Sequence, residues 1–336
     1  MSTSVNALAW KVADGEAVLA EAPGPSGTPP QVLVQVRYTG VCGSDVPKLS
    51  RTWNGPIPAP WFPGHEIVGR EAGSDQWVAV DPLIGCATCR DCRHGRIHLC
   101  PALRRIGWDL PGGLAEAVRV PPASVVEIPN LQDPAHGTLA DPMAVALHGV
   151  RCGLPAPCGR IGIVGAGPLG ICTAVAAAAA GWEVHLAVRS AARHRELHAA
   201  LAGRHLSVHN GALPLCEAVV DAASGHNDSP LRQAIEAVRD GGTVLVQNAY
   251  LPGVTFSAPL RDLFRRSITV RGSFSYCRAG GRDDFRDALA LLEHGGPWAD
   301  LLTRDRYPLP ELPQALAALQ GPGPSRPIKV LLTPNS

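Results

Sequence analysis

Cysteine side chains in the first third of the chain lie at spacings that suit metal binding. Cys86, Cys89, Cys92 and Cys100 follow a C-x2-C-x2-C-x7-C pattern inside a segment without strand or helix pattern. Four thiolates at these gaps can wrap one tetrahedral ion and leave no open position, which predicts a structural zinc site. An iron–sulfur cluster and a redox-active CxxC pair use similar thiolates and stay open as alternatives.

A second set of candidate ligands is spread over three segments. Cys42 follows a β-rich segment and has glycines close on either side, His65 begins another such segment, and Asp141 precedes a proline. One thiolate, one imidazole and one carboxylate leave zinc an open fourth position, which a catalytic site requires. The sequence therefore predicts a catalytic zinc site in addition to the structural one.

A glycine-rich turn suggests that the protein binds a nucleotide. Gly165, Gly167 and Gly170, with Pro168 and Leu169 between them, form a GxGxxG that follows an apolar strand pattern and opens a helix of small residues. In this context the glycines let the backbone approach a pyrophosphate, which the helix N-terminus faces. We therefore expect a dinucleotide site, with a purely structural turn as the alternative.

The end of the next predicted strand indicates which dinucleotide binds. An NAD site places Asp or Glu about 20 residues after the glycines, but Arg189 stands 19 residues after Gly170 and the next carboxylate is Glu196. Arg189 and Ser190, with Arg193 nearby, would bind a 2′-phosphate through charge-assisted hydrogen bonds. The sequence thus favours NADP(H) over NAD(H), and use of both cofactors stays open.

Length and composition exclude several other classes of protein. The 336 residues suggest about two domains, and 46% hydrophobic residues can form sizeable cores. Lys and Arg number 30 against 29 Asp and Glu, and aromatics make up 5%, so neither nucleic acid nor a membrane is an expected partner. The N-terminus has no signal-peptide pattern, and the uncharged stretch 161–182 is broken by glycines. We expect a cytoplasmic protein.

The order of sequence patterns predicts an α/β fold with two domains. The first third contains short β-rich runs, whereas strand and helix patterns alternate from about residue 147, which is typical of a doubly wound parallel sheet. Two helical stretches and a last strand follow and are assigned to the first domain. The expected domains are residues 1–146 with 280–336, and 147–279. The remaining cysteines lack ligand spacing and are expected to be small buried residues: Cys152, Cys158, Cys172, Cys216 and Cys277.

Five motifs in this order resemble those of zinc-dependent medium-chain alcohol dehydrogenases. They are GVCGSD, PGHE, the four-cysteine segment, DP-x-x-VALH and GxGxxG, and they cover essentially the whole chain. Within that superfamily the chain is most similar to sorbitol, galactitol-phosphate and aminocyclitol (deoxy-scyllo-inosamine) dehydrogenases. The resemblance implies a GroES-like catalytic domain, a Rossmann domain, two zinc ions per chain and a homodimer or homotetramer.

The resemblance also assigns roles to individual residues. Cys42 and His65 match the first two catalytic zinc ligands. Asp141 stands where relatives usually have glutamate, and Glu66 matches a carboxylate that either ligates zinc or exchanges with water, so both stay candidates for the third ligand. Ser44 matches the hydroxyl that passes on the substrate proton.

The chain departs from the resemblance at the next step of the proton relay. Pro47 replaces a histidine that many relatives carry, so the relay must end in water or the cofactor ribose. Lys48 falls where relatives line the substrate pocket and suggests a phosphorylated or otherwise anionic substrate, with a surface lysine as the alternative.

These features together predict reversible hydride transfer between NADP(H) and a secondary alcohol or ketone of a polyol, sugar or cyclitol. An aldehyde or simple-alcohol dehydrogenase is one alternative. A non-catalytic NADPH-binding protein that keeps only the fold is another.

Overall fold

The computed structural model describes residues 7–21, 31–128, 130–203, 205–223, 225–258, 260–323 and 326–334. Contacts within the chain divide it into two units. Unit 1 comprises Met1–Asp141 and Cys277–Ser336, and unit 2 comprises Pro142–Tyr276.

Unit 1 is built on a mixed sheet of short strands. Within the described residues this sheet has seven strands in the order β16-β17-β3-β4-β5-β9, with β8 also paired to β3. Its strands are β3 (Val32–Gly40), β4 (Glu66–Glu71), β5 (Trp77–Val80), β8 (Ala117–Val120), β9 (Val125–Glu127), β16 (Arg306–Pro308) and β17 (Leu331–Thr333). Alternate side chains such as Val34 and Val36 are fully buried in an aliphatic cluster, as expected for a strand with one face on a core.

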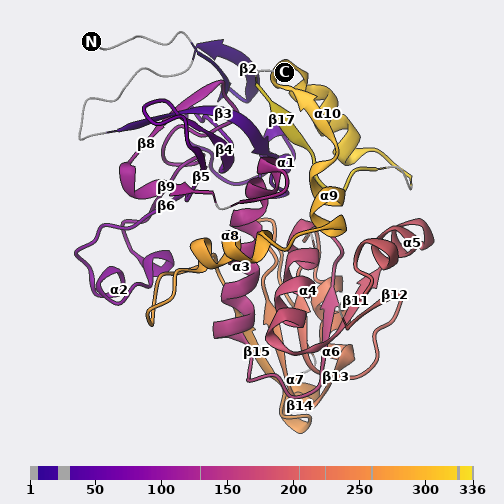
Figure 1. Cartoon of the computed structure of the whole chain (residues 1–336). Coiled ribbons are helices and arrows are strands. Elements are labelled where there is room, and N and C mark those ends of the chain that lie inside the picture. Colours follow the sequence, from indigo (N-terminus) through magenta and orange to yellow (C-terminus); the bar gives the residue numbers. More distant parts are fainter. Residues whose placement is uncertain are drawn as a thin grey trace. The chain divides into compact units, whose positions relative to one another are not determined.

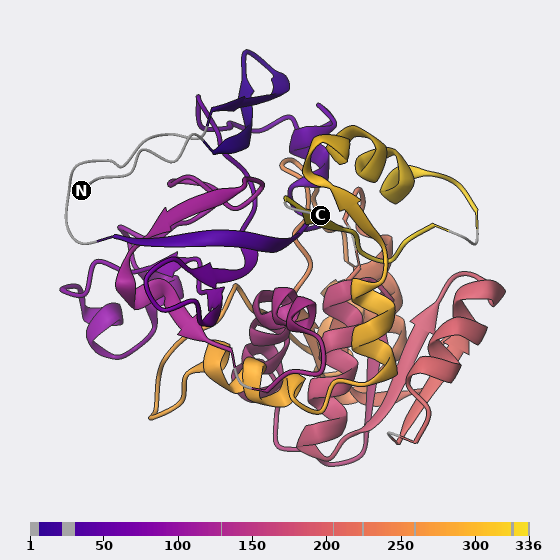
Figure 2. The ribbon, with the colours of Figure 1, turned by 45° about the horizontal axis from the view of Figure 1, so that its top comes forward.

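The end of the chain completes this sheet. Strand β17 pairs antiparallel with β3, with Leu331 opposite Gly40 and Leu332 opposite Thr39. The yellow C-terminal ribbon accordingly lies beside the indigo ribbon of β3 in both views (Figures 1 and 2). Residues more than 290 positions apart therefore become neighbours at the end of β3.

Short elements surround the sheet of unit 1. Two small antiparallel pairs are β1 (Leu8–Ala13) with β2 (Glu16–Glu21), and β6 (Leu83–Ile84) with β7 (Arg104–Arg105). The helices are α1 (Val46–Leu49), α2 (Arg90–Arg93), α8 (Asp284–Leu292), α9 (Pro297–Thr303) and α10 (Leu312–Gln320), with 3-10 turns at Ile97–Leu99, Pro122–Ser124, Pro134–Leu139 and Leu309–Glu311.

Unit 2 is a doubly wound parallel sheet, which confirms the predicted fold class. The six strands in the described part of unit 2 run in the order β12-β11-β10-β13-β14-β15, and all neighbouring pairs are parallel. They are β10 (Arg160–Val164), β11 (Glu183–Val188), β12 (Leu206–Asn210), β13 (Cys216–Asp221), β14 (Val238–Val246) and β15 (Thr269–Gly272). The chain order reverses between β10 and β13, and ligands of such sheets bind beyond the carboxyl ends of the strands at this point.

Helices precede and alternate with the strands of unit 2 (Figure 1). They are α3 (Ala140–His148), which begins at the end of unit 1, a π-helical turn (Gly149–Gly153), α4 (Pro168–Ala180), α5 (Ala191–Ala200), α6 (Ser229–Ala237) and α7 (Leu260–Arg265). Among the described residues no helix combines the length and the apolar character that a membrane crossing needs, and the alanine-rich α4 ends after 13 residues.

Some local predictions were wrong. Strand β12 was not predicted, because Val208 is its one buried residue and leaves almost no apolar alternation. The four-cysteine segment contains the short helix α2, although no helix pattern is visible there. Cys152 and Cys158 are exposed rather than buried.

Candidate active site

Cys42 and Ser44 lie in the turn between β3 and α1. The Asp45 amide donates to the Cys42 carbonyl oxygen at 3.0 Å, which closes the turn. The Ser44 hydroxyl donates to Cys42 Sγ at 3.2 Å. A hydroxyl that can hold a proton therefore lies directly beside the sulfur that the sequence predicts as a metal ligand.

The register of β3 against β4 brings His65 and Glu66 to the same place. Gly40, the last residue of β3, pairs with Glu66, the first residue of β4. One ligand atom each from Cys42, His65 and Glu66 lies within 4.8 Å of the other two. A thiol, an imidazole and a carboxylate at this separation form a donor set that suits zinc and leaves a fourth position open.

Asp45 orients the imidazole of this group. His65 Nδ1 lies 3.2 Å from Asp45 Oδ2, so Nε2 is the nitrogen left for a metal. Burial opposes protonation of the ring, but the charges of Asp45 and Cys42 outweigh it and raise the pKa of His65 well above its ordinary value. Asp45 was not predicted as a functional residue, although it stands only three residues after Cys42.

Glu66 has a buried partner from the far end of the chain. Its Oε2 forms an ion pair with Lys329 Nζ, and both side chains are almost inaccessible to water. A Cβ atom on Gly40 would lie 1.9 Å from Glu66 Oε2 and 2.8 Å from Lys329 Cε, so glycine is needed there to make room for the pair. Lys329 was missed because 263 residues separate it from Glu66.

The second candidate carboxylate occupies a different position. Asp141 lies in the first turn of α3, and the described ligand group of Cys42, His65 and Glu66 does not include it. Burial raises the pKa of Asp141 to about 6, with His65 opposing and Glu66 adding to the shift. Of the two carboxylates that the sequence left open, the structure brings Glu66 to the thiol and imidazole.

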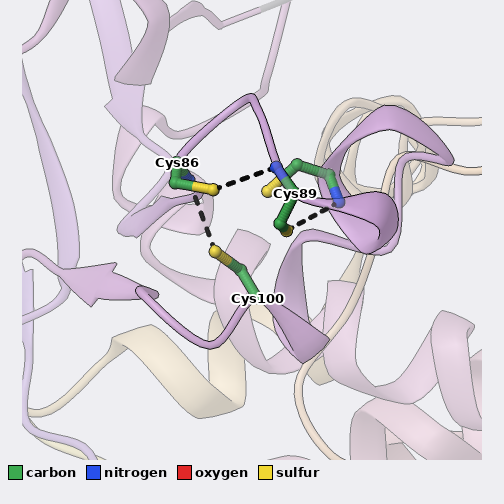
Figure 3. Close-up of side chains that lie close together, drawn as sticks. Cys86, Cys89 and Cys100 are labelled. Carbon is green, nitrogen blue, oxygen red and sulfur yellow. Dashed lines mark hydrogen bonds between the residues drawn. The ribbon is translucent and has the colours of Figure 1, made fainter.

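The four cysteines of the predicted structural zinc site do converge. One sulfur each from Cys86, Cys89, Cys92 and Cys100 lies within 4.8 Å of the other three. Main-chain amides donate to three of these sulfurs at 3.3–3.4 Å: Cys89 to Cys86, Cys92 to Cys89, and Cys86 to Cys100 (Figure 3).

The thiols of this group differ in acidity. Hydrogen bonds from Thr88 and the Cys89 amide lower the pKa of Cys86 to about 6. Burial and the neighbouring thiols of Cys89 and Cys100 raise the pKa of Cys92 to about 12. Four thiols at these distances cannot all ionise without a bound positive charge, and a closed tetrahedral zinc ion supplies one.

The glycine-rich turn lies at the carboxyl end of β10. Gly165 has a φ of +110°, and a Cβ on it would lie 2.7 Å from the main chain of Ala223. A Cβ on Gly170, within α4, would meet the Gly165 carbonyl oxygen at 1.9 Å, whereas Gly167 has open space around its Cα. Pro168 and Leu169 form the first turn of α4. The turn thus leaves a main-chain surface open at a helix N-terminus, which suits a pyrophosphate.

Comparison with known proteins gives a consistent result. Residues 28–130 match the alcohol dehydrogenase GroES-like domain. The D-altritol 5-dehydrogenase of Agrobacterium fabrum is 32% identical over 329 residues, which cover 90% of this chain and 92% of that protein. The L-galactonate-5-dehydrogenase of Escherichia coli is 29% identical over 305 residues, which cover 84% of this chain and 86% of that protein. The chain belongs to the zinc-type alcohol dehydrogenase family.

A solved structure extends this likeness to both units of the dehydrogenase. A zinc-binding dehydrogenase from Sinorhizobium meliloti, crystallised with NADP bound, superimposes with a TM-score of 0.80 at 27% identity. The match covers 98% of this chain and 99% of that one. The two-domain α/β fold and the oxidoreductase class predicted from the sequence are confirmed.

Arg189 and Ser190 directly follow β11 in this dehydrogenase. Arg189 is exposed, and Ser190 caps α5 by accepting a hydrogen bond from the Arg193 amide at 3.1 Å. The Ser190 hydroxyl hydrogen is therefore left to donate elsewhere. The Arg193 guanidinium instead pairs with Glu196 at 2.5 Å.

Loss of one thiol from the four-cysteine site should lower stability before it lowers activity. We expect Cys89→Ser to remove one metal ion per chain and lower the Tm by at least about 5 °C, since a structural zinc contributes folding free energy. Metal analysis and a thermal melt measure both effects. The exposed Cys158 provides the control, because Cys158→Ser should change neither. A Cys89→Ser protein with full metal content would contradict the zinc assignment.

Proposed function

We propose that this dehydrogenase transfers hydride between NADP(H) and a secondary alcohol or ketone of a polyol, sugar, sugar acid or cyclitol. The observation that carries the proposal is the group of Cys42, His65 and Glu66 with the Ser44 hydroxyl beside its sulfur. The two relatives named above act, by their names, on a sugar alcohol and a sugar acid, which supports the substrate class.

Two zinc sites per chain are part of the proposal. Cys42, His65 and Glu66 would hold the catalytic ion, with Asp141 as the other carboxylate that could reach it. The four-cysteine site would hold the structural ion: Cys86, Cys89, Cys92 and Cys100. When bound, the catalytic zinc supplies a Lewis acid and the nicotinamide supplies or accepts the hydride.

The protein's own residues then manage the proton. Ser44 Oγ accepts the proton that leaves the alcohol during oxidation as it gives up its own hydroxyl hydrogen, and the transfer runs in reverse during ketone reduction. Pro47 has no side-chain acceptor to continue a relay, so the proton passes from Ser44 to water or to the cofactor ribose.

The NADP(H) preference rests on the end of β11. Arg189 offers an exposed guanidinium and Ser190 an unused hydroxyl hydrogen, and both can donate to a 2′-phosphate. Among the described residues no carboxylate stands at this position to bond a ribose hydroxyl. Arg193 contributes mainly through its amide, because Glu196 holds its guanidinium.

A homo-oligomer formed through unit 2 also belongs to the proposal. Strand β15 is the edge of the described sheet, and all four of its residues are exposed. Five large apolar side chains on β15, on α7 and in the adjoining segments are exposed, and we propose that they form one apolar face: Phe256, Leu260, Phe264, Val270 and Phe274. A second copy could pair its own β15 antiparallel across a two-fold axis and cover both apolar faces. The location that we propose for the assembled enzyme is the cytoplasm.

A substrate panel tests the reaction itself. We expect faster NADP⁺ reduction with polyols, sugar acids and polyol phosphates than with primary alcohols, measured by absorbance.

Cys42→Ser should lower kcat about 100-fold or more with the melting curve retained, because a Lewis acid contributes several kcal/mol to the stabilisation of the transition state. Unchanged turnover in Cys42→Ser would remove catalytic zinc from the account, and Cys158→Ser is the matched control.

Reversing the charge at residue 189 tests the cofactor. We expect Arg189→Asp to raise the KM for NADPH about 10- to 100-fold, since a charge-assisted contact is lost and repulsion added. The KM for NADH should change by less than about threefold and serves as the internal control. Equal effects on both cofactors would refute the assignment.

Charges placed on the apolar face test the assembly. Light scattering of the wild-type protein should give a dimer or tetramer, and Leu260→Asp with Phe264→Asp should reduce it to smaller species. Leu215 is similarly exposed, at 62%, but lies outside the face. Leu215→Asp should therefore leave the mass of the assembly unchanged. A monomeric wild-type protein would contradict the proposed homo-oligomer.

A further inference from the structure

The chain uses lysine sparingly, and two of its lysines lie at the candidate catalytic centre. Among 30 lysines and arginines there are three lysines: Lys11, Lys48 and Lys329. Lys329 is buried against Glu66. Lys48 is also buried, with 9% of its side chain exposed, and its Nζ lies 3.9 Å from Asp45 Oδ1. Each buried lysine thus faces a carboxylate that belongs to, or supports, the group of Cys42, His65 and Glu66.

Groups of the protein itself contact the Lys48 ammonium. Its Nζ donates to the Ser44 carbonyl oxygen. It also lies over the rings of Trp53 and Trp108, at 4.7 and 5.1 Å from their centroids. A main-chain carbonyl, a carboxylate and two aromatic faces therefore share this one cation.

Helical spacing explains why these groups meet. Ser44 and Asp45 precede Lys48 by four and three residues, and the Lys48 amide bonds the Asp45 carbonyl oxygen at 3.0 Å. This single turn points Lys48 back toward both residues. Asp45 then uses its other oxygen, Oδ2, to approach His65 Nδ1 at 3.2 Å. Asp45 lies between the ammonium and the imidazole.

We propose that Lys48 is a positioning residue that holds Asp45 and the Ser44 main chain in place behind His65 and Cys42. The kinetic part of this inference rests on the proposed function, whereas the structural part does not. Removing the group that hydrogen-bonds the other ring nitrogen of a metal-ligating histidine typically weakens metal binding or activity about 10- to 100-fold. Lys48 would act one step farther out, through Asp45.

This role differs from the one that the sequence suggests, namely binding an anionic group of the substrate. A substrate anion would have to compete with Asp45 and the Ser44 carbonyl oxygen for the ammonium, over which the rings of Trp53 and Trp108 also lie. Burial also lowers the pKa of Lys48 from its ordinary value, with Asp45 opposing the shift.

Lys48→Met removes the charge and keeps an apolar stem. It distinguishes a positioning role of Lys48 from binding of a substrate anion. The matched control is Lys11→Met, on β1, away from any carboxylate contact in the described residues. Both proteins are loaded with cadmium, whose NMR signals at the two centres differ because the donor sets differ. We expect Lys48→Met to shift the signal of the Cys42–His65–Glu66 centre and to leave the four-thiol signal unmoved.

A double-mutant cycle shows whether the effect passes through Asp45. The shift caused by Lys48→Met should be largely lost when Asp45→Asn is already present. In the zinc enzyme, kcat should fall about tenfold for neutral and carboxylated polyols alike, with the KM of both changing by less than about twofold. Lys11→Met should alter none of these values.

Three results would overturn the proposal. A KM that rises only for carboxylated or phosphorylated polyols, with the cadmium signal unmoved, would make Lys48 the anion receptor. No change in any quantity would make it a packing residue, and additive shifts with Asp45→Asn would exclude Asp45 as the link. If Lys48→Met does not fold, Lys48→Gln gives the same comparison. A wild-type protein inactive on all polyols would refute the proposed function, while the cadmium spectra would still decide the role of Lys48.

Discussion

The register of three strands at the end of β3 determines where the groups of the candidate catalytic centre lie. Gly40 pairs with Glu66 on one side and with Leu331 on the other. Because side chains alternate across a sheet, a slip of one residue in either pair would turn Glu66 or Lys329 to the opposite face. The centre is therefore a property of strand pairing, and the turn that carries Cys42 begins where that pairing ends.

Charge balance imposes the second constraint on this centre. Glu66 and Asp45 are both buried, and burying a carboxylate without a partner costs several kcal/mol. Lys329 offsets the charge of the first, while Lys48 and His65 share the second. Breaking one such buried pair typically costs about 3–5 kcal/mol, because it leaves the other charge uncompensated. The two buried lysines thus offset the repulsion between the carboxylates that lie around the thiol and the imidazole.

The parts of the protein that could be predicted from sequence are those whose signals are local. The glycine-rich turn and the four cysteines each span fewer than 16 residues, so spacing alone indicates a nucleotide turn and a metal loop. The pairing of Glu66 with Lys329 could not be predicted, since nothing near Lys329 distinguishes it from a surface lysine. Strand β12 failed for a related reason, because its place in the sheet depends on neighbours rather than on its own apolar pattern. The tertiary context, rather than the local sequence, decides the structure and the contacts of such residues.

The two candidate metal centres consequently form under different conditions during folding. The four thiols lie within one loop, so the cost in chain entropy of bringing them together is small and is met locally. The other centre needs β3, β4 and the strand at the very end of the chain, and contacts of such sequence separation are slow to form. Until β17 has paired with β3, Lys329 cannot reach Glu66. A chain without Lys329 and β17 would therefore keep the four-cysteine site and lose the charge balance around Glu66. The chemistry of this dehydrogenase thus depends on the completed sheet of unit 1.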